Sequence, residues 1–307
     1  MVHVEPGDAI IVQDAKYGPQ NKVHFGFADG LSQPEAIKQD IDTEVAKNGG
    51  LRWNPGAPLN LLFEPDTAGG FGSYLVFRKL EQNVRGFYQA ERELTAALGL
   101  PTTEAARVEA MIVGRHRNGE PAIAQQPTDP GTPGNDFNFD GDRFGITCPF
   151  HAHIRRSNPR GDLSSPGIQR PALPLDSERG LRIARRGIPY GDADYLRDGR
   201  DSATYPDSGI GLLFMSFQAR LQNFELQQGG SDANDFPMPN IGVDATIGRS
   251  AAPIAQHWYF PAQLPGPPGS QVDASGELRF TIANFVTLKG GEYFYAPGLS
   301  FLRSLSV

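Results

Sequence analysis

The spacing of apolar and polar positions predicts a strand followed by two helices in the first half of the chain. Residues 73–78 are rich in β-forming side chains and predict a strand. Apolar residues then recur at helical spacing, at positions 84, 87, 88, 94 and 98, and predict an amphipathic helix. A second helix is expected over residues 103–113. A strand paired with a helix in this way is typical of an α+β unit.

The second half continues this alternation of strands and helices. Residues 212–217 predict a buried strand, residues 218–228 a helix, and residues 279–288 and 293–295 further strands. Nearer the start, a short helix is expected over residues 34–46, with Ser32 as its cap and a stop at Asn48. Segments rich in Pro, Gly, Asn and Asp predict loops at 125–145, 157–176 and 229–268, the last as a long surface excursion.

Length and composition place the chain among folded proteins. Its 307 residues, 39% of them hydrophobic, suffice for one large domain or two small ones. The formal net charge of −7 argues against a nucleic-acid partner, because phosphate binding needs concentrated positive charge. The single cysteine, Cys148, excludes an intramolecular disulfide.

The first residues lack the basic and apolar regions of a signal peptide, and no apolar run approaches the roughly 18 residues of a membrane span. We therefore expect a soluble protein without an export signal of its own and no membrane partner, which favours the cytoplasm.

Three short segments carry residues that could bind a cofactor or take part in catalysis. His151 and His153 lie in the segment Cys148-Pro-Phe-His-Ala-His-Ile-Arg, and a neutral imidazole can occupy an axial position on haem iron. By spacing alone a solvated basic loop fits equally well, and the two histidines cannot be told apart. Asp29, in Gly-Phe-Ala-Asp-Gly, is by itself typical of a turn, and the pair Arg185-Arg186 is typical of a basic surface patch.

Taken together, the segments of His153 and Asp29 resemble the signature of the dye-decolourising peroxidases, a family of haem enzymes. Four further segments resemble the family in its order, at 72–82, 185–191, 211–218 and 285–294. The resemblance implies an α+β fold with a ferredoxin-like antiparallel sheet and helices. It also implies haem b as cofactor, hydrogen peroxide as oxidant, and phenols, dyes or similar organic molecules as reductants.

The chain departs from this family at its start. Members usually consist of two ferredoxin-like halves, with the Gly-x-x-Asp-Gly segment after most of the first half, whereas here that segment begins at Gly26. The resemblance therefore implies a remnant of the first half at residues 1–50 and a haem-binding second half at residues 51–307. We expect a second polypeptide or another copy of the chain to complete the fold, packed next to residues 26–34, because half of a two-sheet core would expose apolar surface. Rearrangement of the remainder, or a fragment of a longer protein, stays an open alternative.

The resemblance also implies residue roles. His153, followed by Ile-Arg, would be the proximal iron ligand. Asp29 would act as acid and base toward hydrogen peroxide, favouring activity in acidic conditions, and the fixed charge of Arg185 would stabilise the departing oxygen. Leu212 and Phe214 would form an apolar distal wall, although they are equally typical of strand core. The remaining expectations concern Arg186, which would face a haem propionate or solvent, and four oxidisable side chains for bulky substrates: Trp258, Tyr259, Tyr293 and Tyr295.

Two other functions fit the sequence. A haem-free structural or binding protein could keep the fold and motifs without the chemistry, and would remain colourless when haem is supplied. A protein that handles haem or releases its iron would share the ligand His153 and differ only in its product.

Overall fold

The computed structural model describes residues 7–29, 62–65, 70–123, 137–165, 171–198, 201–252, 254–259, 277–282 and 284–305. The helix expected over residues 34–46 lies outside this part of the chain. So does the expected division between residues 50 and 51, which therefore stays a prediction.

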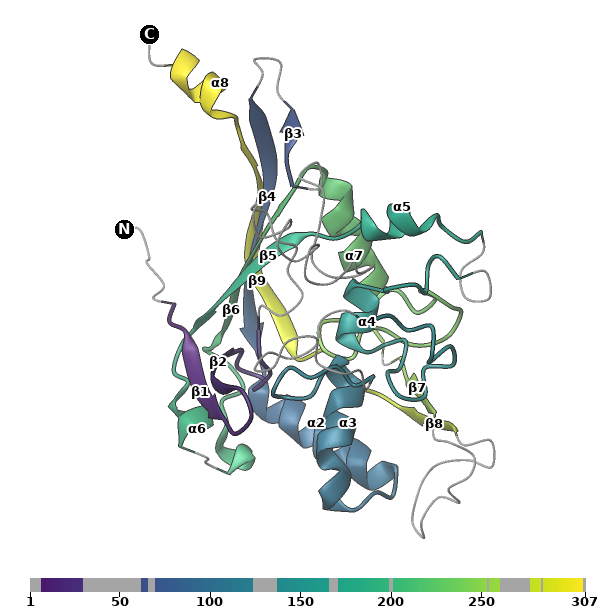
Figure 1. Ribbon diagram of the computed structural model, residues 1–307. Helices are drawn as coiled ribbons and strands as arrows, with labels where there is room; N and C mark the ends of the chain where they lie inside the picture. Colours follow the sequence, from purple (N-terminus) through teal and green to yellow (C-terminus); the bar gives the residue numbers. More distant parts are fainter. Residues whose placement is uncertain are drawn as a thin grey trace.

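The largest sheet has the ferredoxin-like arrangement expected from the sequence. Along the chain its elements follow the order strand, helix, strand, strand, helix, strand, and its main strands lie side by side in the order β9-β4-β6-β5, with every neighbouring pair antiparallel (Figure 1). The short β3 pairs with the first two residues of β4. The strands of this sheet are β3 (Glu64–Pro65), β4 (Phe71–Gln82), β5 (Ala184–Tyr190), β6 (Gly211–Gln218) and β9 (Val286–Ala296).

The register of the strands assigns side chains to two faces of this sheet. Arg78 lies opposite Phe214, and Leu80 lies opposite both Leu212 and Leu288, so these side chains share one face. We call this the inner face, because α7 (Leu221–Asp232) packs on it through Phe224, which contacts Val76 and Phe214. The opposite face of the sheet is called the outer face.

A long helix and a short one build the core beside the sheet. α2 (Val84–Ala97) begins where the Asn83 side chain accepts a hydrogen bond from the Gly86 amide, and it buries Val84, Phe87 and Leu94 completely. α3 (Ala105–Val113) ends at Gly114, whose left-handed φ of +91° suits a glycine and turns the chain toward the sheet.

The remaining elements are short. Two two-stranded sheets accompany the main sheet, one near the start of the chain and one nearer its end. These elements are β1 (Ile10–Asp14) with β2 (Gly18–Lys22), β7 (Gln256–Tyr259) with β8 (Glu277–Phe280), α4 (His153–Ser157), α5 (Leu175–Arg179), α6 (Asp194–Arg197), α8 (Leu299–Ser304), and the 3₁₀ turns Thr102–Glu104 and Ser202–Thr204. No helix in the described ranges is long and apolar enough to cross a membrane.

The structure corrects one loop prediction. The segment 229–268 was expected to be a surface excursion, yet Val243, Asp244, Ala245 and Trp258 in its described part are completely buried. Composition misled here because the Asp244 carboxylate accepts hydrogen bonds from the amides of Thr246 and Ile247, which lets a polar loop enter the core. The strand predicted over residues 279–288 is wrong: β8 ends at Phe280 and β9 begins at Val286, in a different sheet, because the Gln256 side chain binds the backbone of Ile282 between them. Residues 293–295 are part of β9, and the other strands and helices predicted for the described residues are present within a few residues of their expected bounds.

Candidate active site

The inner face of the sheet forms one wall of a cavity of about 260 Å³. α4, α7 and the segment 246–249 close the other side. An adjoining hollow of about 160 Å³ shares nine of the cavity's residues, among them Arg115, His153 and Arg185. All the site residues predicted from the sequence line the larger cavity: Asp29, His153, Arg185, Leu212 and Phe214. Folding thus brings together residues from four separate segments.

His153 is oriented by a buried carboxylate. Its Nδ1 lies 2.9 Å from Oδ2 of Asp244, a side chain with no exposed surface. Although burial acts in the opposite direction, the contacts with His153 and with two backbone amides lower the pKa of Asp244. The carboxylate is therefore an acceptor, so Nδ1 carries the proton and Nε2 keeps its lone pair. A histidine whose second nitrogen donates to a carboxylate is the usual arrangement of a metal-ligating histidine.

His151 occupies a different environment. It is buried with its ring against that of Trp258, at 4.2 Å between centroids, and it does not line the cavity. Burial and the charge of Arg156 hold the pKa of His151 well below its ordinary value. The two histidines, equivalent by spacing, are thus distinct in the structure.

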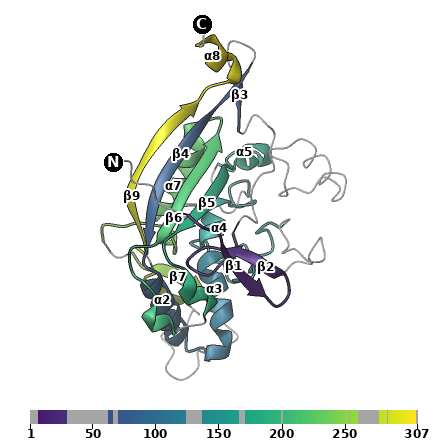
Figure 2. The same cartoon turned by 90° about the vertical axis from the view of Figure 1, so that its left-hand side faces the viewer.

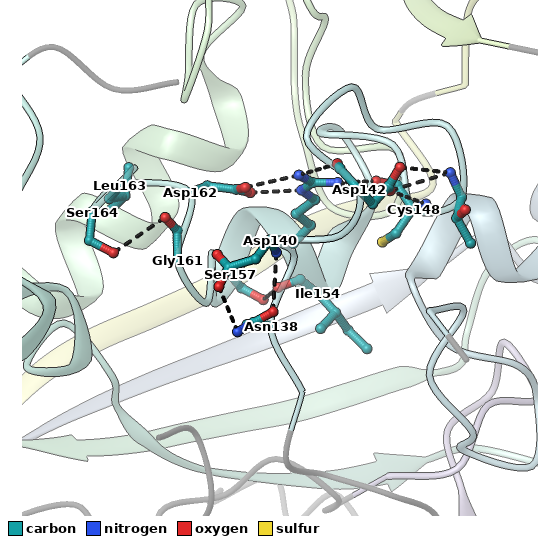
Figure 3. Close-up of polar contacts among 12 residues, drawn as sticks. Asn138, Asp140, Asp142, Cys148, Ile154, Ser157, Gly161, Asp162, Leu163 and Ser164 are labelled. Carbon is teal, nitrogen blue, oxygen red and sulfur yellow. Dashed lines mark hydrogen bonds and ion pairs between the residues drawn. The ribbon is translucent and has the colours of Figure 1, made fainter. Parts of the chain in front are cut away.

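Buried arginines fix the short helix that carries His153. Arg155 donates to Asp162 at 2.7 Å and to Asp142 at 3.1 Å, and both carboxylates are labelled in Figure 3. Asp142 also accepts hydrogen bonds from three successive backbone amides, those of residues 146–148. Arg156 donates to the Gly230 carbonyl at the end of α7. These contacts hold α4 on two sides.

Asp29 and Arg185 form an ion pair at the cavity wall. Arg185 Nη1 donates to Asp29 Oδ1 at 2.8 Å, and the Asp29 side chain is 8% exposed against 35% for Arg185. β5 supplies Arg185, while the backbone of Asp29 is fixed by its amide, which donates to the Asn21 carbonyl at 3.0 Å. A carboxylate and a guanidinium thus face one cavity together, as the sequence predicted.

Sequence reasoning missed two residues of this site. Asp244 lay in a segment predicted as a surface loop, and no pattern in that segment marked it. Arg115 lines both hollows and is 3% exposed, and burial together with the nearby charge of Arg185 lowers its pKa to about 10. Its position directly after the glycine that ends α3 was the one available signal.

The cavity has the chemistry that haem requires. Its lining holds four arginines but a single carboxylate, Asp29, in a chain whose net charge is −7. An excess of positive charge suits the two propionates of haem, and apolar side chains from three strands suit its ring. The four arginines are Arg78, Arg115, Arg185 and Arg249. With the free nitrogen of His153, the residues present fit the cofactor.

The other candidates divide between surface and core. Arg186 is exposed and lies opposite Met215 on the outer face, away from the cavity. Of the two environments expected for Arg186, a haem propionate or solvent, the structure therefore shows solvent. Trp258 is completely buried and donates from its ring nitrogen to the Phe280 carbonyl. Tyr293 and Tyr295 are each nearly half exposed, and Arg78 at the cavity donates to the Tyr293 hydroxyl at 3.1 Å. The side chain of Tyr259 lies outside the described part of the structure.

The segment before Asp29 contains a buried histidine that predicts acid sensitivity. His24 Nε2 donates to the Tyr190 carbonyl and Nδ1 accepts from the Tyr195 hydroxyl, each at 2.8 Å, and burial lowers its pKa. The unfolded chain therefore takes up this proton at higher pH than the folded protein. The stability that neutral His24 contributes is complete above the unfolded pKa of about 6.5 and is lost as the pH falls below it.

We expect the free energy of unfolding to decline more steeply toward acid in the wild type than in His24→Gln. The difference approaches about 1.4 kcal/mol per pH unit for one proton. Urea unfolding of both proteins at about pH 7.5 and pH 5 measures it. Equal declines would contradict the role given to His24.

The sequence of the chain is similar to those of several known proteins. No model of a known protein family matches the chain. Among curated proteins, the multifunctional dye peroxidase DyP2 of Amycolatopsis is 42% identical over 299 residues, covering 92% of this chain and 60% of that protein. The dye-decolorizing peroxidase msp1 of Mycetinis scorodonius is 32% identical, covering 93% of this chain and 57% of that protein.

Solved structures of similar proteins align with this chain as well. The structure of DyP2 from Amycolatopsis aligns with a TM-score of 0.79 at 38% identity, covering 97% of this chain and 64% of that one. A DyP-type peroxidase from Anabaena aligns with a TM-score of 0.75 at 35% identity, covering 98% and 60%. The chain therefore spans about three fifths of the length of these relatives.

Proposed function

The chain belongs to the dye-decolourising peroxidase family over the part of its relatives' length that it spans, and on this premise we propose that it binds haem b and oxidises phenols, dyes or similar organic reductants with hydrogen peroxide. The observation that carries the proposal is the single cavity in which an oriented histidine, Asp29 and Arg185 meet. Haem, when bound, supplies the iron centre that exchanges electrons with peroxide and reductant.

His153 would hold the iron through Nε2. Nδ1 keeps its proton and donates a hydrogen bond to Asp244. Hydrogen bonding to a carboxylate raises the basicity of a ligating imidazole. Because Asp244 is buried and also bound by two backbone amides, it fixes both the tautomer and the ring orientation of His153.

Asp29 would move the proton of hydrogen peroxide. As a carboxylate it takes the proton from the oxygen that enters the site, and as the conjugate acid it returns the proton to the oxygen that departs. Arg185 holds the carboxylate in place at 2.8 Å and presents a fixed positive charge that stabilises the negative charge on the departing oxygen. Leu212 and Phe214 narrow the cavity around this pair.

The proposed activity has a direct test. Protein supplied with haem should oxidise a chromogenic phenolic donor only when hydrogen peroxide is present, and free haem at the same concentration serves as the control. A folded protein that stays colourless with haem would instead favour a haem-free binding protein. Release of iron from haem without donor oxidation would favour haem handling.

The contact between His153 and Asp244 yields a quantitative prediction. Asp244→Asn should weaken haem binding about 10–100-fold, the usual effect of losing an outer partner of a metal ligand, while Asp176→Asn, at a side chain that is 95% exposed, should not. Haem titration followed by absorbance measures both affinities. Equal affinity of Asp244→Asn and wild type would show that this carboxylate does not orient the ligand.

We propose that a second polypeptide covers the outer face of the main sheet. The outer face of the main sheet carries seven apolar side chains from four strands, none of them buried, and Figure 2 shows the strands of this face in front of α7. They are Leu75, Phe77, Ile188, Leu213, Met215, Phe217 and Phe294. A sheet normally buries an apolar face of this size. In the segment 26–34, beside which the partner was expected, Phe27 packs against Phe87 of α2, and residues 30–34 lie outside the described part of the chain.

We therefore expect the active species to contain a second polypeptide, either a different chain or another copy, on this outer face. Light scattering should give a mass above that of one chain, and Phe217→Glu should lower it because a charge cannot be buried there unpaired. Phe144→Glu, at a side chain that is 76% exposed, is the matched control. A stable wild-type monomer that binds haem stoichiometrically would refute the expectation.

A further inference from the structure

The segment that carries Asp29 in the cavity wall is contacted from behind by Arg117, which lies outside the cavity. The segment 23–29 forms a tight turn in which the Gly26 amide donates to the Val23 carbonyl at 2.7 Å and the Val23 amide donates to the Phe27 carbonyl at 3.0 Å. Behind this turn lies Arg117, which does not line the cavity. Its Nη1 donates to the Phe25 carbonyl in the middle of the turn.

Arg117 is itself held on several sides. Nη2 pairs with Glu91 of α2 at 2.6 Å, Nε pairs with Glu109 of α3 at 2.9 Å, and Nη1 also donates to the Tyr88 hydroxyl at 2.8 Å. Glu91 is 5% exposed, so this ion pair is largely withdrawn from water. Since α2 and α3 fix the guanidinium, its contact with Phe25 fixes the turn relative to both helices.

The backbone of Arg117 makes a second contact with the same segment. Its carbonyl accepts a hydrogen bond from the Ala28 amide at 3.1 Å, one residue before Asp29. The guanidinium also stacks on the ring of Phe27, at 4.7 Å from the centroid. Arg117 thus contacts the segment at residues 25, 27 and 28.

The fit around the turn leaves little freedom. Gly26 has a φ of +85°, and a Cβ placed there would lie 2.5 Å from the Tyr88 hydroxyl and 2.6 Å from Arg117 Nη1. The turn therefore packs directly on these two groups, and a shift of Arg117 moves the backbone that leads to Asp29.

We propose that Arg117 is a positioning residue of the active site, which holds the turn 23–29 so that Asp29 meets Arg185. The inference rests on the proposed function, because it assigns Arg117 a role in the step that Asp29 carries out. Arg117 itself does not line the cavity, so its effect on the reaction passes through the residues that it contacts, 25, 27 and 28, which lead to Asp29.

A double-mutant cycle tests this route. Arg117→Met should slow the reaction of the haem-loaded protein with hydrogen peroxide about 100-fold, the usual cost of misplacing a catalytic group by about 1 Å. In an Asp29→Asn background the same substitution should cause no further loss, because the group it positions is already gone. A full further loss in that background would overturn the proposal.

The matched control is Glu109→Gln, which weakens one ion pair of Arg117 but leaves its contacts with Phe25 and Tyr88. It should lower stability without slowing the peroxide reaction. If it slows the reaction as much as Arg117→Met does at equal stability, the effect is general destabilisation and the proposal fails. Arg117→Lys keeps a charge beside Glu91 but lacks the fork that reaches Phe25 as well, and can replace Arg117→Met in the cycle if the methionine variant does not fold.

Hydrogen exchange separates this proposal from the proposed function, because it requires no reaction. The amides of Gly26, Ala28 and Asp29 should exchange faster in Arg117→Met than in wild type, and at the wild-type rate in Glu109→Gln. Unchanged exchange in Arg117→Met would overturn the role of Arg117 whatever the activity. Faster exchange in a protein that never reacts with peroxide would leave the hold of Arg117 on the turn established and refute the peroxidase function instead.

Discussion

Replacing His153 with alanine is expected to abolish haem retention, whereas replacing His151 with alanine is expected to leave it intact. The reason is the position of the two rings. His153 lines the cavity with its Nδ1 bound to Asp244, so its Nε2 lone pair is available, while His151 is buried against Trp258 outside the cavity. Absorbance of the purified variants after incubation with haem measures the effect.

A control is needed because His151→Ala removes a buried side chain and will destabilise the fold. Circular dichroism of each variant verifies folding, and haem binding is compared only between folded proteins. Retention of haem by His153→Ala together with its loss in folded His151→Ala would reverse the assignment of the ligand.

Asp29→Asn and Arg185→Leu are each expected to bind haem but to react slowly with hydrogen peroxide. A group that transfers a proton in the reaction typically contributes about 10²–10⁴-fold to the rate, and an asparagine cannot accept or return the proton. Loss of Arg185 removes both the charge that stabilises the departing oxygen and the hydrogen bond at 2.8 Å that holds Asp29. Stopped-flow absorbance with excess peroxide gives the rate constants.

Because Asp29 and Arg185 contact each other, their effects should not add. The double variant is expected to be little slower than the slower single variant, since each substitution already disables the pair. Arg197→Leu, on α6 away from the cavity and from the outer face, is the control and should react at the wild-type rate. Wild-type rates for both Asp29→Asn and Arg185→Leu would show that neither residue has the role proposed here.

The periodic elements could be predicted from the sequence because each has a clear pattern. The helix over Val84–Ala97 buries apolar residues at helical spacing, and β6 carries the apolar run expected over residues 212–217. The site residues could be named only through the motif resemblance. Spacing alone left His151 and His153 equivalent, and only the fold shows that one faces the cavity and the other the core.

The rest of the site depends on contacts between distant segments. Asp244 lies 91 residues from His153, in a stretch whose composition is typical of a surface loop. Arg115 and Arg117 follow α3 in a turn without any motif, and their roles arise from what folds against them. No local pattern records that the Phe25 carbonyl or the carboxylate of Glu91 lies beside a given guanidinium.

The central claim is that this chain binds haem in its cavity and does so as part of a larger species. Native mass spectrometry of the purified protein, titrated with haem, tests both parts at once. We predict one haem for each copy of the chain in a complex that contains a second polypeptide, with His153→Ala forming the complex but taking up no haem. A folded wild-type protein that takes up no haem at any ratio, or a His153→Ala variant that binds it fully, would contradict the account.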